Sequence, residues 1–188
     1  MLVAILSDIH DNLWNLAAAL AYVKAADCEV LICCGDLCSP FVMDRLREFP
    51  GPVHIVFGNN DADLFRITKK SDARLQVHGE FLELTLDRRR LAVNHFDNIA
   101  RPIALSGEYD LVCYGHNHRF HIARLGRTLV INPGPIMGAA GFSTTGWQDV
   151  PPTFVVYDTA VHTAAAFFVT SDKQVLPHSF TLADSWPG

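Results

Sequence analysis

The sequence predicts a single α/β domain in which two sheets pack against each other. Over the first 60 residues, continuous apolar runs alternate with helical patterns, an order of β-α-β-α-β. That order implies parallel pairing with right-handed crossovers. In the second half, strand-like runs follow one another, which favours a second sheet over further crossovers. The length of 188 residues fits one domain with a core of ordinary size.

The first half contains three predicted strands and two predicted helices. Leu2–Leu6 and Val30–Cys34 are apolar throughout, as strands buried on both faces are, and Val53–Phe57 is a third predicted strand. Asn12 can cap a helix whose apolar positions recur at spacings of three and four. A second, shorter helix is expected over Phe41–Phe49, and Pro50-Gly51-Pro52 should stop it.

The second half is a succession of predicted strands: Phe81–Leu86, Leu91–Phe96, Leu111–Tyr114, His121–Leu125, Thr128–Asn132, Thr153–Tyr157 and Ala164–Val169. Asp87-Arg88-Arg89-Arg90 and Gly126-Arg127 are predicted hairpin turns. Residues 170–188 form a predicted peripheral tail. The Gly-rich segment Asn132–Gly146 is either a surface loop or a lip of the active site, since long loops in compact domains are often functional.

The composition of the chain indicates which kinds of partner and which cellular compartment to expect. Fifteen Lys and Arg against twenty Asp and Glu give a net charge of -5, so we expect no nucleic-acid partner. No signal peptide and no apolar run of about 18 residues is visible, which predicts a cytoplasmic protein with no membrane partner. The apolar strands of the second half leave a homo-oligomer open. Nine histidines are many for this length, and histidine is the commonest metal ligand.

The five cysteines lie in apolar, strand-like settings. Cys33 and Cys34 are neighbours on one predicted strand and point to opposite faces, so they are poor disulfide partners. We therefore expect reduced thiols in a cytosolic protein. A zinc site on Cys34 and Cys38 would lack the second Cys or His pair that structural zinc needs.

Polar residues follow five of the apolar runs, at the points where the strands end. In chain order they are Asp8 and His10, Asp36, Asn59 with Asp61, His95, and His116 with His118. The carboxyl ends of parallel strands are where α/β sheets build their sites. Carboxylates, imidazoles and an amide together form a cage for cations, and this mixed ligation suits manganese, iron or zinc.

The spacing of these residues supports a common site. In Asp8-x-His10 and His116-x-His118, an extended backbone would turn both side chains to the same side. Asp36 can use its two oxygens to bridge two metals. Glycines precede three of the motifs and let the chain turn sharply: Gly35, Gly58 and Gly115. Read singly, most of these motifs are ordinary turns, but chance does not readily explain five in order.

The order D-x-H, GD, GNND, H, GHNH resembles the calcineurin-like metallophosphoesterase superfamily over about residues 1–170. The length resembles its small prokaryotic phosphodiesterase branch. The resemblance implies a two-sheet β-sandwich flanked by helices. It implies that one metal is held by Asp8, His10, Asp36 and His118. It implies that a second metal is held by Asp36, Asn59, His95 and His116. Asn132-Pro133-Gly134 resembles a segment that follows these motifs in the family.

The predicted activity is hydrolysis of small phosphodiesters with two divalent transition metal ions, manganese first, with iron, zinc, nickel or cobalt as alternatives. Such ions polarise the phosphoryl oxygens and lower the pKa of a bridging water, so that hydroxide exists near neutral pH. Catalytic roles fall to Asp36, Asn59 and His95, with the Asn59 amide offsetting charge on the equatorial oxygens. Asp61 is predicted to orient Asn59 or a neighbouring ligand.

Three positions depart from the family pattern: Asn60, where many members have a histidine that protonates the leaving group, Phe96, often glycine, and Pro135, often serine. None removes a metal ligand. Two kinds of alternative function remain. One is a phosphomonoesterase, protein phosphatase or nuclease with the same chemistry. The other is a non-catalytic interaction module resembling the retromer subunit that uses this scaffold, which predicts eroded ligands.

The remaining candidates are weaker. Arg88–Arg90 is interpreted as a solvated turn and not a phosphate clamp. Arg119 and His121 follow the last motif closely enough to be substrate contacts. Trp14 is expected in the core. Four histidines without ligand-type neighbours are interpreted as packing or surface residues: His54, His78, His162 and His178.

Overall fold

The apolar runs of the N-terminal half form the centre of a seven-stranded sheet in the computed structural model, which describes residues 1–143 and 146–186. In spatial order its strands are β14 (Val175–Pro177), β13 (Thr163–Val169), β12 (Thr153–Asp158), β1 (Leu2–Leu6), β2 (Val30–Cys33), β3 (Val53–Ile55) and β4 (Leu75–Val77). The strands from β1 to β4 are parallel, and the others pair antiparallel. The parallel half therefore comes from the predicted crossovers.

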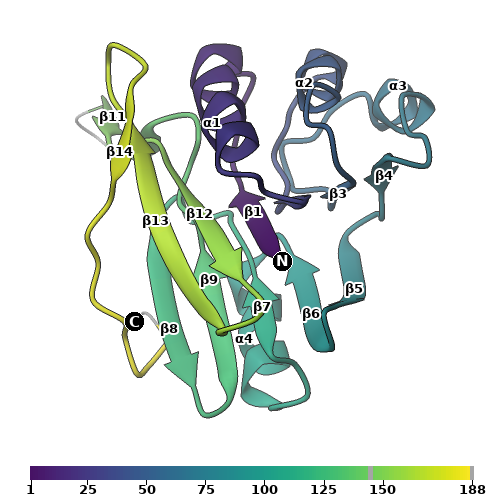
Figure 1. Ribbon diagram of the computed structural model, residues 1–188. Coiled ribbons are helices and arrows are strands. Elements are labelled where there is room, and N and C mark those ends of the chain that lie inside the picture. The colour runs from purple at the N-terminus through teal and green to yellow at the C-terminus, as the bar shows by residue number, and fades with distance from the viewer. Residues whose placement is uncertain (144–145, 187–188) are drawn as a thin grey trace.

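A five-stranded sheet packs against the first (Figure 1). Its strands are β5 (Phe81–Leu86), β6 (Arg89–Asn94), β7 (Leu111–Cys113), β9 (Thr128–Asn132) and β8 (His121–Leu125). The two predicted hairpins, β5–β6 and β8–β9, lie at its edges, and the central strands β6, β7 and β9 are parallel. A short ribbon, β10 (Ala139–Ser143) and β11 (Gly146–Asp149), stands apart from both sheets.

Helices cover the outer faces of this sandwich (Figure 1). α1 (Leu13–Ala25), α2 (Pro40–Leu46) and α3 (Leu64–Lys69) lie on the seven-stranded sheet, and α4 (Asp97–Leu105) packs on β6, β7 and β9 of the other sheet. The Asn12 side chain accepts a hydrogen bond from the Asn15 N–H at 3.1 Å, as the predicted cap requires. The predicted sandwich flanked by helices is confirmed.

The side chains of β1 point alternately into two different cores, which explains why its whole sequence is apolar. Val3 and Ile5 belong to the core between the two sheets, whereas Ala4 and Leu6 belong to the core under the helices. Successive side chains of a strand point to opposite faces, and both faces of this strand are covered. A third, smaller core lies between α4 and the five-stranded sheet.

Several elements were not predicted. α4 joins β6 to β7 as a parallel crossover, so the second half does not consist of strands alone. It contains Pro102, which interrupts the helical signal. α3 buries only Ile67 and so carries little apolar periodicity. β4, β14 and the ribbon are short strands in polar or Gly-rich surroundings.

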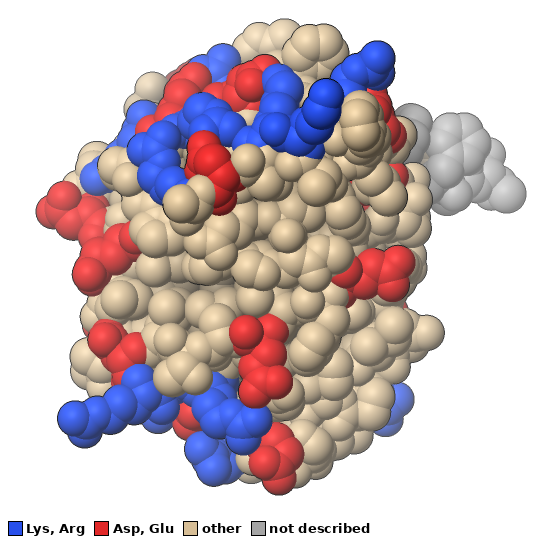
Figure 2. Space-filling model, turned by 90° about the vertical axis from the view of Figure 1, so that its right-hand side faces the viewer, with Lys and Arg blue, Asp and Glu red and all other residues tan. Residues whose placement is uncertain are grey.

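The predicted tail and the surface complete the description. In the described part of the tail, β14 pairs with β13 and the Trp186 ring stacks on Tyr114 at 4.9 Å. Trp14 is 72% exposed, so its predicted place in the core is wrong. Among the residues 1–143 and 146–186, no helix is both long and apolar enough to cross a membrane. On the face in Figure 2, Lys and Arg lie beside Asp and Glu at both ends, with a largely uncharged band between.

Candidate metal centre

The loops that leave five strands converge at one edge of the stacked sheets. They carry all seven predicted ligands: Asp8 and His10 after β1, Asp36 after β2, Asn59 after β3, His95 after β6, and His116 and His118 after β7. Parallel strands deliver their carboxyl ends to the same edge of a sheet. Side-chain contacts divide these residues into two groups that meet at Asp36.

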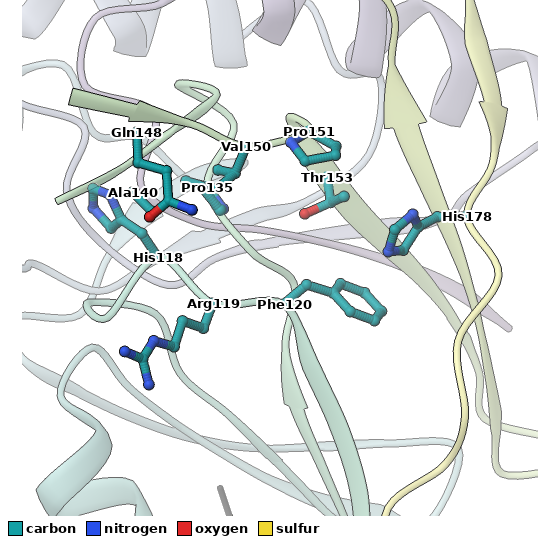
Figure 3. Close-up of a pocket in the computed structure, with 10 residues that line it drawn as sticks. All are labelled: His118, Arg119, Phe120, Pro135, Ala140, Gln148, Val150, Pro151, Thr153 and His178. Carbon is teal, nitrogen blue, oxygen red and sulfur yellow. The ribbon is translucent and has the colours of Figure 1, made fainter. Parts of the chain in front are cut away.

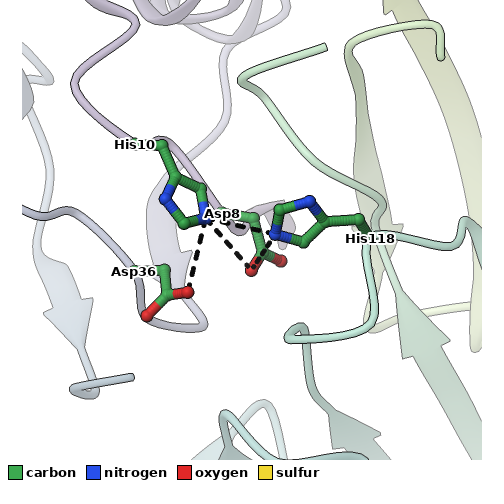
Figure 4. A group of neighbouring side chains, drawn as sticks. All are labelled: Asp8, His10, Asp36 and His118. Carbon is green, nitrogen blue, oxygen red and sulfur yellow. Dashed lines mark hydrogen bonds and ion pairs between the residues drawn. The ribbon is translucent and has the colours of Figure 1, made fainter. Parts of the chain in front are cut away.

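The first group is the four-residue cluster of Asp8, His10, Asp36 and His118 (Figure 4). One ligand atom from each residue lies within 4.8 Å of the others. His10 Nε2 is 3.3 Å from Asp36 Oδ2 and 3.1 Å from His118 Nε2, which is itself 3.3 Å from Asp8 Oδ1. Two carboxylates and two imidazoles aimed at one point can hold a divalent cation.

The second group consists of Asn59, His95 and His116, on the other side of Asp36. Asn59 Oδ1 lies 3.1 Å from His95 Nε2 and 2.8 Å from His116 Nδ1. His95 Nε2 is also 3.4 Å from Asp36 Oδ2, the same oxygen that faces His10. A single carboxylate oxygen therefore lies between the rings of both groups, as a bridging ligand would.

The tautomers of two rings can be assigned from the carbonyl groups behind them. His95 Nδ1 is 2.8 Å from the Cys34 carbonyl oxygen, and His118 Nδ1 is 2.8 Å from that of Ala139. A carbonyl only accepts, so each Nδ1 carries the hydrogen and, in the neutral ring, Nε2 presents a lone pair. These lone pairs face carboxylate oxygens of Asp36 and Asp8.

Lone pairs that face carboxylate oxygens require a proton or a cation between them. Burial lowers the pKa of His95 and His118, but hydrogen bonds to Asp36 and Asp8 outweigh it, and both pKa values lie above the ordinary value. A divalent cation meets the same demand while leaving the rings neutral. The donor set therefore fits metal ions, with second-layer carbonyls that orient the rings.

Asp36 is held from behind by Asn60. The Asn60 backbone N–H donates to Oδ1 and the side-chain amide donates to Oδ2, both at 2.8 Å. Burial raises the pKa of Asp36, but its bonds to His95 and Asn60 outweigh this and hold the pKa far below the usual range. The residue that departs from the family pattern thus fixes the orientation of the shared carboxylate.

Asp61 acts on the backbone of the loop that carries Asp36. Its Oδ2 accepts from the N–H groups of Gly58 at 2.7 Å and Asp36 at 3.1 Å. Its Oδ1 accepts from those of Leu37 at 2.6 Å and Cys38 at 2.9 Å. The carboxylate therefore ties the loops after β2 and β3 together, and its contacts position Asp36 through the main chain.

The backbone of the ligand loops is not extended, which corrects the spacing argument. Five predicted ligands have left-handed backbone, with φ from 43° to 71°: Asp8, His10, Asp36, His116 and His118. Such strain persists where surrounding contacts enforce it. His118 reaches the four-residue cluster while His116 turns to Asn59, so the two rings belong to the two groups on either side of Asp36.

The three glycines have different roles. Gly35 has φ of +102°, the conformation that the sharp-turn argument predicts. Gly58 and Gly115 are required for close approach instead. A Cβ on Gly58 would lie 2.2 Å from Asp36 Oδ1, and one on Gly115 would lie 1.9 Å from Ser7 Oγ. A side chain at either position would displace the ligand loops.

The segment Asn132–Gly146 borders the site, apart from residues 144–145, which lie outside the described residues. The N–H groups of Ile136 and Met137 donate to the carbonyls of Ser7 and Asp8, both at 3.0 Å. Ala139 supplies the carbonyl behind His118. Of the two interpretations left open, the structure supports a lip on the active site. These three contacts are made by backbone groups of the segment, which leave no signature in a sequence, whereas the Asn132 side chain also donates to the Gly115 carbonyl at 3.0 Å.

Two further residues enter the surroundings of the site. The ring of Phe96 packs edge-on against His95 at 5.2 Å and His116 at 5.1 Å, so this departure from the family pattern buttresses both rings. His178 was assigned to packing or the surface, but it lines a pocket that begins at His118. It lies 60 residues further along the chain, and only the tertiary fold brings the two together.

Comparison with known proteins identifies the family of the chain. The family model of the calcineurin-like phosphoesterase superfamily domain matches residues 1–161. A phosphodiesterase of Methanocaldococcus jannaschii is 29% identical over 154 residues, which cover 79% of this chain and 93% of that protein. The chain therefore belongs to the calcineurin-like phosphoesterase superfamily and is a phosphoric ester hydrolase.

Solved structures show the same fold. An archaeal phosphodiesterase superposes with a TM-score of 0.78 and 26% identity, covering 90% of this chain and 100% of that one. Vacuolar Protein Sorting 29 from Cryptosporidium parvum has a TM-score of 0.69 at 20% identity, covering 94% of this chain and 95% of that one. The second likeness concerns the fold alone.

Proposed function

We propose that the chain is a dinuclear metal-dependent phosphodiesterase that hydrolyses small phosphodiesters, with manganese as its preferred ion. The observation that carries the proposal is the position of Asp36 Oδ2, which lies 3.3 Å from His10 Nε2 and 3.4 Å from His95 Nε2. One carboxylate shared between two sets of oxygen and imidazole donors is the arrangement that a metal pair requires. Mixed oxygen and imidazole donors without thiolate favour manganese over a structural zinc site.

The residues divide the work of the site between them. Bound ions supply Lewis-acid activation of water and of the phosphoryl oxygens. Asp36, oriented by Asn60, holds the two groups of ligands at a fixed separation. Asn59 Oδ1 lies between the His95 and His116 rings as a donor atom for a metal, and the NH2 group of the same amide would donate to a phosphoryl oxygen as charge builds there. The carbonyls of Cys34 and Ala139 keep two rings in one tautomer.

The position of Asn60 also bears on the leaving group. An amide does not protonate a departing alkoxide, and this amide already donates to Asp36. No imidazole therefore stands where many family members have one. We infer that the enzyme favours esters whose leaving groups depart without protonation, such as aryl phosphodiesters.

The rival functions are less well supported. A non-catalytic module would be expected to lose ligands, whereas all seven are retained here. The phosphodiesterase reading draws on the archaeal relative that carries that name. The net charge of -5 supports a small substrate and not a nucleic acid. The five free cysteines support a cytosolic location.

The direct test compares hydrolysis of bis(p-nitrophenyl) phosphate and p-nitrophenyl phosphate by metal-stripped protein, before and after addition of Mn²⁺. We expect manganese-dependent release of p-nitrophenolate, faster from the diester. Faster release from the monoester would favour a phosphomonoesterase. No release with any of the five candidate metals would support the non-catalytic alternative.

A further inference from the structure

A pocket of about 400 Å³ begins at His118 and extends away from the metal centre (Figure 3). One side comes from Pro135, from Ala140 of β10 and from Gln148 of β11. The other side comes from Phe120, Thr153 and, from the C-terminal segment, His178. Its volume falls within the range of about 300–1,000 Å³ that holds small organic ligands. A phosphoester bound at the metal centre would therefore have space for one of its ester groups here.

Thr153 provides an independent sign of a ligand. The residue is only 2% exposed, and its hydroxyl has no hydrogen-bond partner among the residues that the structure describes. Its oxygen points toward the middle of the pocket (Figure 3). Buried hydroxyl groups are normally satisfied, and an unsatisfied one calls for an explanation. A polar atom of a bound ester group would supply the missing partner.

The other walls indicate what kind of group this is. Phe120 and three further apolar residues, Pro135, Val150 and Pro151, offer flat, hydrophobic surface. The rings of Phe120 and His178 meet edge to face at 4.8 Å, which holds the Phe120 ring in place. Gln148 is exposed and carries both a donor and an acceptor on one planar amide. Flat apolar walls with a few polar groups suit a planar ring that has hydrogen-bonding edges.

We propose that this pocket binds a planar heteroaromatic ester group, of the size of a nucleoside, and so selects phosphodiesters that carry one. The inference rests on the proposed function, because the phosphoryl group must lie at the metal centre for its substituent to enter here. Thr153 and Gln148 are specificity-determining residues in this proposal: the first satisfies a polar atom inside the pocket, and the second binds the edge of the ring.

The test is a calorimetric titration of manganese-loaded protein with thymidine 5′-monophosphate and with methyl phosphate. Both probes carry the same phosphate, so the ratio of their dissociation constants isolates the pocket. We expect the thymidine ester to bind at least about tenfold more tightly. Gln148→Ala and Thr153→Val should each reduce this ratio by about three- to tenfold, the effect of one lost hydrogen bond.

Two controls separate binding from folding. Gln76→Ala removes the same side chain from β4, outside the pocket, and should leave the ratio unchanged. Thr153→Val keeps the shape and removes a hydroxyl without a protein partner, so its melting temperature should equal or exceed that of the wild type. A purely structural role for Thr153 would instead lower the melting temperature and leave the ratio intact.

Failure of this inference is distinct from failure of the proposed function. A protein that hydrolyses bis(p-nitrophenyl) phosphate with Mn²⁺ but binds both probes equally would overturn the pocket assignment alone. So would pocket variants that keep the wild-type ratio. Absence of hydrolysis with every candidate metal would overturn the proposed function instead.

Discussion

Two pairs of histidines in this sandwich have the same side chain but face different partners. His95 and His118 each place Nε2 within 3.4 Å of a carboxylate oxygen and Nδ1 against a backbone carbonyl. His54 and His78 face each other, with Nδ1 and Nε2 3.0 Å apart, and no carboxylate in the described part of the chain pairs with either ring. Burial lowers the pKa of both members of this second pair.

The difference shows which surroundings would suit a histidine to hold a metal in this fold. An acceptor behind the ring fixes its tautomer, and an anion in front creates a demand for positive charge. The pair of His54 and His78 lacks the anion, so a neutral ring is the stable form there. Substitutions in the first region should therefore affect metal binding and activity, whereas those in the pair of His54 and His78 should affect only the pH dependence of stability.

The largest effect is expected for Asp36→Asn. Asp36 faces both groups of ligands, so its charge supports each ion. The variant should lose at least about 100-fold in phosphodiesterase rate, about 2.7 kcal/mol of barrier, and should retain metal less well. The matched control is Asp44→Asn on an exposed face of α2, which should keep the wild-type rate. If Asp36→Asn kept more than about a tenth of the rate, Asp36 would not be the bridge.

The next effect concerns how the rate depends on the leaving group, because Asn60, which donates to Asp36, stands where many family members have a histidine. Without a general acid, which contributes about 10²–10⁴-fold where present, the wild-type rate should fall steeply as the leaving group becomes more basic. Asn60→His should flatten that dependence if the imidazole reaches the leaving oxygen. The measurement is log rate against leaving-group pKa over a series of aryl and alkyl diesters. A shallow slope in the wild type, with chemistry rate-limiting, would point to another proton donor, and His121 would be the first to substitute.

The two histidine pairs can be compared directly by replacing one histidine of each pair with asparagine. His118→Asn removes a ring that faces Asp8 and should weaken binding of Mn²⁺ by at least about tenfold. His54→Asn makes the same change in the pair of His54 and His78 and should alter manganese affinity by less than about twofold. Calorimetric titration of both variants with Mn²⁺ provides the comparison. Equal losses would mean that the carboxylates do not distinguish the two regions.

The smallest effect concerns the pH dependence of stability. Burial, and for His54 also repulsion from His78, lowers the pKa of these rings below the value of about 6.5 in the unfolded chain. The unfolded state then binds more protons as the pH falls through 6.5, and native stability declines. The melting temperature should fall about 1–3 °C more in the wild type than in His54→Asn between about pH 7.5 and pH 5. If the melting temperature of His54→Asn fell as much as that of the wild type, the pair of His54 and His78 would not be the cause of the pH dependence.

How far the sequence predicts the molecule depends on the kind of signal. β1 and β2 are predictable because they are apolar on both faces, and the β8–β9 hairpin because Gly126-Arg127 marks its turn. α4 is not predictable in the same way, because Pro102 breaks its pattern. The seven candidate ligands are predictable because carboxylate, imidazole and amide side chains are themselves the groups that bind metals. The Cys34 and Ala139 carbonyls were missed because every residue has one.

Conformation and long-range packing account for the rest. Asp8 and His118 have left-handed backbone, which Asp and His tolerate better than most residues but do not usually adopt, so the sequence alone does not predict it. Thr153 and His178 reach the pocket from distant parts of the chain, and neither has a neighbour in sequence that suggests a role. Local patterns predict strands and turns, whereas the arrangement of loops around a site depends on the packed fold.

The central claim is that Asp36 joins two metal sites, and metal stoichiometry tests it most directly. Purified protein is stripped of metal, reconstituted with excess Mn²⁺, freed of unbound ion and measured by elemental analysis against protein concentration. His54→Asn serves as the control and should match the wild type. We expect two ions per chain in the wild type. One ion or none at saturating Mn²⁺ would contradict it.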